Sequence, residues 1–208
     1  MKNNIFVAKL IEINAIRLNP DNPFTWASGW LSPIYCDNRI TLSFPEIRAE
    51  ICRHFSDLIS THFPSVNSIA GVATGAIAHG ALVAHEMGLP FAYVRSSPKN
   101  HGLENLIEGK LHSHSKVVVV EDLISTGKSS LQAVEALRNA GCEVLGMVAI
   151  FTYGFDVAKQ NFAKQNVPLY TLASYDDLIT QATEQNLISP HQHRTLLEWR
   201  KDPGNWKK

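Results

Sequence analysis

The sequence contains little cysteine and no excess of charge of either sign. Three cysteines, Cys36, Cys52 and Cys142, are spread through 208 residues without CxxC spacing, so neither a disulfide framework nor a zinc site is indicated. The charges of the 19 basic and 19 acidic side chains cancel, so the net charge gives no indication of binding to nucleic acid. No apolar run is long enough to span a membrane. Because the N-terminal segment is amphipathic and lacks a signal-peptide core, we expect a cytoplasmic protein.

The spacing of apolar residues predicts an α/β fold. Strands are expected at 68–72, 91–94, 117–121, 144–151 and 168–173, and helices at 5–16, 76–87, 128–140, 175–182 and 190–199. A capping box formed by Ser43 and Glu46 predicts one more helix, which stops before Pro64. Two consecutive βαβ units predict a mostly parallel sheet flanked by helices, with ligands at the carboxyl ends of its strands. Residues 1–208 are expected to form a single domain, with a core of about 40–173 and a small hood from 1–39 and 174–208.

The most informative stretch, residues 117–130, reads VVVVEDLISTGKSS. Four valines without alternation indicate a strand that is buried on both faces and ends near Glu121. The small residues that follow Asp122 let backbone N–H groups meet an anion where the next helix begins. Although the end of the stretch matches a Walker A loop, Asp122 stands where that loop requires glycine. The acid pair suits the hydroxyl groups of a ribose 5-phosphate, or Mg²⁺ between ribose and pyrophosphate, while a solvated turn is the alternative.

Three other segments contain residues suited to a ligand. Residues 95–102, RSSPKNHG, are typical of a lid that closes over an anionic leaving group, or else of a solvated basic loop. Residues 71–76, GVATGA, form a turn that a phosphate is able to approach, although close packing explains it equally well. The aromatic side chains of 24–39 are suited to stacking on a flat heterocycle or to packing a small appendage.

Residues 117–130 resemble the signature of the type I phosphoribosyltransferases, which use phosphoribosyl pyrophosphate (PRPP). The order Arg, Lys, His, Gly in 95–102, and F-T…S-G…S-P…Y in 24–35, are similar to the orotate phosphoribosyltransferases. The resemblance covers the chain from about Phe24 to its C-terminal helices. It implies the fold of that family and transfer of the 5-phosphoribosyl group from PRPP to orotate, giving orotidine 5′-monophosphate and pyrophosphate in UMP biosynthesis. Mg²⁺ carried on PRPP is implied as the cofactor, without a metal ligand from the protein.

The resemblance also implies roles for individual residues. It assigns PRPP binding to Thr74, Gly75, Arg95, Lys99, His101, Glu121, Asp122, Leu123, Ile124, Ser125, Thr126, Gly127, Lys128 and Ser129. It assigns orotate binding to Tyr35, Cys36 and Ser125, and catalysis to Lys99, His101 and Asp122. The two loop cations are expected to stabilise the leaving pyrophosphate, and the acid pair to hold the ribose hydroxyls. In the family's dimer the loop 95–115 completes the neighbouring site, so a homodimer is expected.

The chain departs from the family pattern at positions where cations are common. Many members have lysine at Ala27, Gly75 and Ser96, a basic residue at Leu31, and an arginine at about Tyr153. The substrate therefore stays open at this point. A purine phosphoribosyltransferase and a regulator that senses PRPP without turnover are the alternatives.

Overall fold

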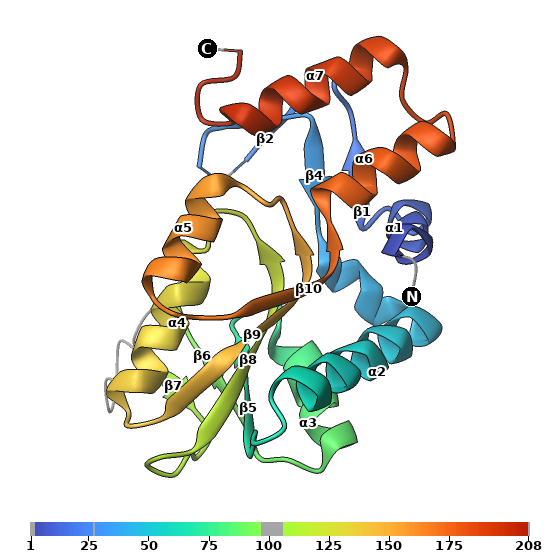
Figure 1. Cartoon of the computed structure of the whole chain (residues 1–208). Helices are drawn as coiled ribbons and strands as arrows, with labels where there is room; N and C mark the ends of the chain where they lie inside the picture. The colour runs from blue at the N-terminus through green and yellow to red at the C-terminus, as the bar shows by residue number, and fades with distance from the viewer. Residues whose placement is uncertain (1–2, 27, 97–105, 208) are drawn as a thin grey trace.

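The computed structural model describes residues 3–26, 28–96 and 106–207. Its centre is a six-stranded sheet with the strand order β10-β9-β8-β5-β6-β7 (Figure 1). In chain order the strands are β5 (Ser68–Val72), β6 (Phe91–Val94), β7 (Ile107–Glu108), β8 (Lys116–Ile124), β9 (Glu143–Thr152) and β10 (Leu169–Ser174). Neighbouring strands are parallel except for β6 and β7. The prediction of a mostly parallel sheet is confirmed.

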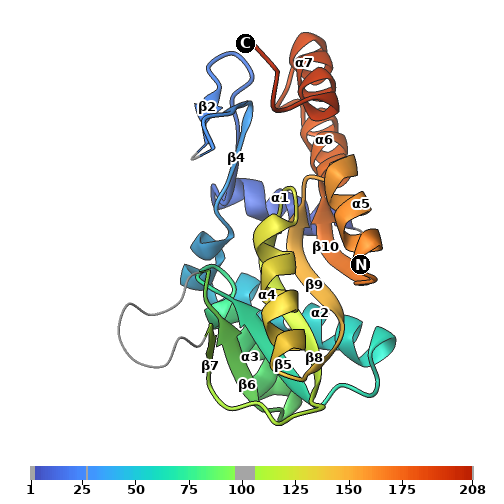
Figure 2. The same cartoon turned by 90° about the vertical axis from the view of Figure 1, so that its left-hand side faces the viewer.

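Helices cover both faces of this sheet. On one face lie α2 (Pro45–His62) and α3 (Ile77–Met87), and on the other lie α4 (Lys128–Asn139) and α5 (Asp156–Lys164) (Figure 2). The four valines of β8 are fully buried, Val118 and Val120 on the α2 side and Val117 and Val119 on the α4 side. Both faces of the strand are apolar because both are covered.

Several elements differ from the sequence-based prediction. The helix expected at 5–16 ends at Glu12, and Ile16 begins a short strand, Ile16–Leu18. The expected end of the strand near Glu121 is wrong, because β9 is long enough to pair with β8 as far as Ile124. The expected capping box at Ser43 is also wrong. Helix α2 begins at Pro45, a residue favoured at the first helical position, and Phe44 precedes it without a side-chain cap. Helix α5 has no counterpart in the prediction.

The N- and C-terminal segments lie together beyond the carboxyl ends of the strands (Figures 1 and 2). The N-terminal elements are α1 (Asn3–Glu12), β1 (Ile16–Leu18), β2 (Phe24–Thr25), β3 (Leu31–Ser32), β4 (Ile34–Cys36) and the 3₁₀ helix η1 (Asn38–Ser43). The C-terminal elements are α6 (Tyr175–Glu184) and α7 (Pro190–Lys201). β1 pairs with β4 and β2 with β3, both antiparallel. We call these two segments the hood.

An aromatic cluster joins the hood to the sheet. Tyr153, which follows β9 directly, has its ring centroid 5.1 Å from that of Trp26 and 5.7 Å from that of Trp199. The Nε1–H of Trp199 donates to the carbonyl of Leu31 at 3.2 Å. Helix α7 therefore holds the N-terminal hairpin in place over the sheet.

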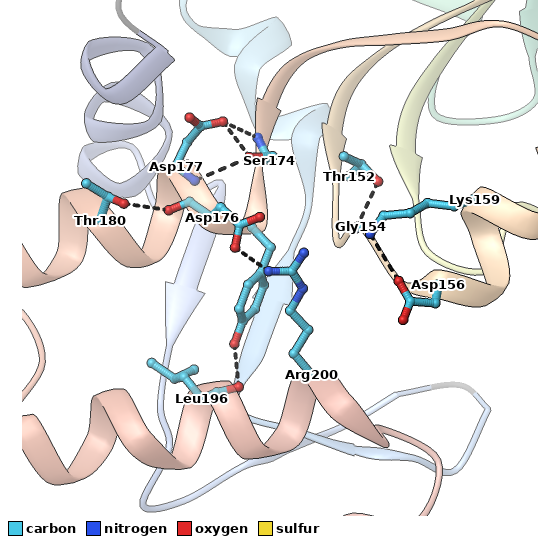
Figure 3. Close-up of polar contacts among 11 residues, drawn as sticks. Thr152, Gly154, Asp156, Lys159, Ser174, Asp176, Asp177, Thr180, Leu196 and Arg200 are labelled. Atoms are coloured by element: carbon cyan, nitrogen blue, oxygen red, sulfur yellow. Dashed lines mark hydrogen bonds and ion pairs between the residues drawn. The ribbon is translucent and has the colours of Figure 1, made fainter.

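The two C-terminal helices are joined by polar contacts (Figure 3). The hydroxyl of Tyr175 donates to the carbonyl of Leu196 at 2.7 Å. Arg200 forms an ion pair with Asp176, and its guanidinium lies 5.1 Å from the centre of the Tyr175 ring. In the part of the chain that the structure describes, no helix is both long and apolar enough to cross a membrane.

Candidate active site

The acid pair belongs to β8, so its two side chains point to opposite faces of the sheet. Glu121 points toward α4 and is only 4% exposed. Its Oε1 accepts a hydrogen bond from the backbone N–H of Asp122 at 3.0 Å, and its Oε2 accepts one from the hydroxyl of Ser130 at 2.8 Å. Burial, and then the charge of Asp122, raise the pKa of Glu121 well above its ordinary value. The neutral form of Glu121 is therefore favoured. Glu121 is also more deeply buried than Asp122.

Asp122 lies on the other face and is half-buried. Its carboxylate lies directly against Gly75, where an added Cβ would be 2.2 Å from Asp122 Oδ2. Because β5 and β8 are parallel neighbours, the turn after β5 meets the carboxyl end of β8. Two segments that the sequence analysis assigns separately to PRPP are thus in contact. The lysine common at position 75 in the family is incompatible with this position of Asp122.

The loop 125–129 leads into α4. Gly127 has a left-handed φ of +76°, and a Cβ at this position would lie 2.7 Å from Phe162. Gly127 is also the N-cap of α4 and provides no capping side chain, while Lys128 and Ser129 are exposed in the first turn. A helix N-terminus without a side-chain cap is a favourable place for an anion such as a phosphate.

The two residues before this loop are structural. Ile124 is fully buried on the α4 side of the sheet, and its carbonyl accepts from the N–H of Tyr153 at 3.0 Å. Leu123 is partly buried and pairs in register with Phe151 on β9. The side chain of Ile124 is therefore not available to a ligand.

Arg95 begins the segment predicted to be a lid. Its guanidinium lies 3.4 Å from a carboxylate oxygen of Glu108. With Ala73 and Ser129 it lines a cavity of about 260 Å³, so residues from all three predicted PRPP segments share one cavity. Lys99 and His101, the other predicted lid residues, lie outside the described residues, as does Ala27.

Tyr35 and Cys36 form the end of β4, in the hood. The guanidinium of Arg17 lies 4.8 Å from the centre of the Tyr35 ring. Burial, and then the charge of Asp122, raise the pKa of the Cys36 thiol well above its ordinary value. The predicted base segment therefore adjoins the acid pair, and Cys36 is held as a neutral thiol.

Two residues shortly after this strand, Asn38 and Arg39, were not predicted as site residues. Arg39 makes two hydrogen bonds to the carboxylate of Asp37, at 2.7 and 2.8 Å, and it lies within the field of Asp122 and Tyr35. Asn38 is buried and donates from Nδ2 to the carbonyl of Asp122 at 2.6 Å. A short Asp-Asn-Arg run is common in turns, and nothing in its spacing predicts these contacts.

Tyr153, at about the position where many members of the family have an arginine, belongs to the aromatic cluster and is 1% exposed. Its ring stacks on that of Phe155, with 5.4 Å between centroids and 9° between planes. Burial raises the pKa of its hydroxyl well above the ordinary value, so it carries no charge. This position supplies packing rather than a cation.

A separate cleft of about 870 Å³ lies between α5, α7 and Trp30 of the N-terminal segment. Of the predicted site residues that the structure describes, only Thr126 lines it, and the carbonyl of Thr126 accepts from Asn161 at 3.1 Å. Arg200 forms part of its wall. The contacts among the predicted residues place the candidate site elsewhere, at the carboxyl ends of β5 and β8.

The chain matches the family model described as "Phosphoribosyl transferase domain" over residues 43–171. It is 61% identical over 202 residues to the orotate phosphoribosyltransferase of Porphyromonas gingivalis, covering 97% of this chain and 96% of the relative. Among solved structures it is similar to the UMP synthase of Leishmania donovani, with a TM-score of 0.79, 26% identity and coverage of 95% of this chain and 42% of that one. It is also similar to the orotate phosphoribosyltransferase of Aeropyrum pernix, with a TM-score of 0.76, 25% identity and coverage of 88% and 99%.

Proposed function

The chain belongs to the orotate phosphoribosyltransferase family, and on that basis we propose that it transfers the 5-phosphoribosyl group of PRPP to orotate. The products are orotidine 5′-monophosphate and pyrophosphate, and the reaction is a step of pyrimidine biosynthesis. One observation supports the proposal above all others. The carboxylate of Asp122 lies against Gly75, so the strand end suited to a ribose 5-phosphate adjoins the turn suited to a pyrophosphate. PRPP carries anionic groups at both ends of its ribose.

In the proposed reaction the bond between C1 of the ribose and pyrophosphate breaks, and its electron pair leaves with the pyrophosphate. Positive charge then develops on the ribose, and a ring nitrogen of orotate, which gives up its proton, supplies the electron pair of the new bond. The protein's task is to position the substrates and stabilise charge, since no covalent nucleophile is required. Asp122 provides the negative charge beside the ribose, while Glu121, with both oxygens held by the protein, fixes the strand end.

We assign the phosphates of PRPP to two backbone turns. The 5-phosphate binds residues 125–129, where the start of α4 offers its N–H groups, and the pyrophosphate binds Thr74 and Gly75. Lys99 and His101 stabilise the departing pyrophosphate, and His101 acts as its proton donor. Mg²⁺ enters with PRPP as part of the substrate. The hard carboxylate oxygens of Asp122 suit this ion, and its charge would offset that of the pyrophosphate.

Orotate binds at Tyr35, Cys36 and Ser125 in this proposal. Its carboxylate requires positive charge, and the positions where the family commonly has cations are occupied here by other residue types. Arg17 lies over the ring of the predicted base residue Tyr35, and Arg39 follows the end of β4, paired with Asp37. We propose that these two arginines provide the positive field.

The homodimer and the cytoplasmic location also belong to the proposal. Arg95 begins a loop that in this family reaches the active site of the neighbouring subunit. Its ion pair with Glu108 fixes the start of that loop. The three cysteines are free thiols, as expected in a reducing compartment.

The test is loss of orotate absorbance that requires added PRPP and Mg²⁺, with orotidine 5′-monophosphate identified as the product. Adenine and hypoxanthine in place of orotate test the purine alternative. Binding of PRPP, measured by a thermal shift, without turnover of any of these bases would indicate a regulator and refute the proposed function.

A further inference from the structure

A chain of buried hydrogen bonds joins the predicted base segment to the acid pair, and Asn38 is at its centre. Asn38 is 1% exposed, at the start of η1. Its Nδ2–H donates to the carbonyl of Asp122 at 2.6 Å, and its Oδ1 accepts from the thiol of Cys36 at 3.5 Å. The two ends of one amide thus contact β8 and β4.

The backbone of Asn38 is also fixed, through η1 and α3. Its carbonyl accepts from the hydroxyl of Thr41 at 2.5 Å, and the oxygen of Thr41 lies 3.2 Å from Nε2 of His79. Because the Thr41 proton is donated to Asn38, the Thr41 oxygen is able to accept from His79 in the tautomer that has its proton on Nε2. Burial lowers the pKa of His79, which is therefore neutral near pH 7. His79 is in the first turn of α3, directly after the turn that contains Gly75.

The hydrogen bond to Asp122 occurs where β8 has lost one neighbour. Pairing between β5 and β8 ends at Gly71 and Val120, two residues before Asp122, whereas pairing with β9 continues to Ile124. Asn38 therefore provides a contact to the end of β8 beyond its last pair with β5. An amide buried in this way is costly to leave unpaired, which makes its position well defined.

We propose that Asn38 is a positioning residue that couples the two substrate sites. Any ligand that shifts the end of β4 also shifts the carbonyl of Asp122 through the amide of Asn38, and the reverse holds as well. Orotate and the ribose phosphate should therefore bind more tightly together than separately. This inference rests on the proposed function and adds to it the residue through which the acceptor and donor sites communicate.

The experiment measures the affinity of orotate by calorimetry with and without saturating ribose 5-phosphate, a pair that cannot react because the sugar carries no pyrophosphate. Coupling of this kind typically changes affinity 5–150-fold. For Asn38→Leu we expect the coupling factor to fall close to 1. For Thr41→Val, which keeps the amide but frees its backbone, we expect an intermediate factor, and this variant serves if Asn38→Leu does not fold.

The control is Asn67→Leu, at an exposed residue that contacts the same strand. Asn67 accepts from the backbone N–H of Lys116 at 2.8 Å, so it holds the opposite end of the same strand. A purely structural role predicts that Asn38→Leu and Asn67→Leu change the coupling factor equally, and that result would overturn the proposal. So would a wild-type protein that binds both ligands without coupling, or an Asn38→Leu variant that keeps the wild-type factor. If the wild-type protein binds neither ligand, the proposed function itself fails.

Discussion

Replacement of Gly75 by alanine is expected to disable the site while leaving the fold intact. The new Cβ would lie 2.2 Å from Asp122 Oδ2 and 2.4 Å from its Cγ, whereas ordinary van der Waals contacts begin at 3.4 Å. The carboxylate must therefore move by about 1 Å or more. It is able to do so because Asp122 is a half-buried side chain at the mouth of the site. The backbone at Gly75 is outside the left-handed region, so alanine itself causes no strain there.

A displacement of about 1 Å in a catalytic group costs about 100-fold in rate. We therefore expect kcat/KM for PRPP to fall about 100-fold, equivalent to about 2.7 kcal/mol of transition-state stabilisation. Thermal stability should change by less than about 1 kcal/mol, since alanine also restricts the unfolded chain. The assays are initial rates of pyrophosphate release and urea unfolding.

The control is Gly88→Ala. Gly88 has a left-handed φ of +64° and no neighbouring atom within 4 Å of an added Cβ, so alanine strains the backbone without touching the site. We expect a loss of about 1 kcal/mol in stability with unchanged kcat/KM, the opposite pattern. In the double variant with Asp122→Asn, the two losses should be far from additive, because both act on one carboxylate. Full additivity, or a Gly75→Ala variant within about threefold of wild-type activity, would refute the reasoning.

Three further predictions concern single charges. Asp122→Asn keeps the shape of the side chain but removes the negative charge, so kcat/KM for PRPP should fall about 100-fold at unchanged stability; an undiminished value excludes the assigned role. Arg17→Met keeps an apolar side chain on the Tyr35 ring but removes one exposed positive charge. At about 6 Å from the orotate carboxylate this charge is worth about 0.7 kcal/mol, so KM for orotate should rise about threefold at low salt. An unchanged KM counts against the role of Arg17. Because the pKa of Glu121 is raised in the folded protein, its protonation contributes to stability. This contribution is fully present below the ordinary Glu pKa of about 4.3 and is lost as the pH rises through the pKa of the folded state. Relative to wild type, Glu121→Gln should gain up to about 1.4 kcal/mol of unfolding free energy per pH unit across that range, whereas parallel pH profiles in urea would contradict it.

The sequence predicts the core of the fold well, because its strands are short apolar runs and its helices have clear periodicity. β5 and β6 have the expected limits. The end of β8 was mispredicted because Glu121 and Asp122 mark a change of polarity rather than an end of pairing, and pairing depends on the length of β9. Helix α5 was missed since Ala158 and Phe162 are its only buried residues, too few to give a clear apolar period.

The candidate site was predictable only where its residues form local motifs. The segments 71–76 and 117–130 are each continuous in sequence, and their small residues directly indicate binding of an anion. Asn38 is separated from Asp122 by 84 positions, and no local pattern encodes that hydrogen bond. Gly75 was recognised as a departure from the family, but only the position of Asp122 shows why a side chain does not fit there. Long-range contacts of this kind require the fold.

The extension of β8 through Ile124 has a consequence for how the acid pair responds to thermal motion. Amides within a central parallel strand exchange with solvent only when a large part of the domain opens. Asp122 thus belongs to the most persistent cooperative unit of the protein, unlike catalytic groups on surface loops. An incoming PRPP molecule meets carboxylates whose backbone is already ordered. The conformational entropy of this backbone is lost when the protein folds and not when PRPP binds. Hydrogen exchange at Glu121 should therefore be as slow as at the four preceding valines, with or without ligand.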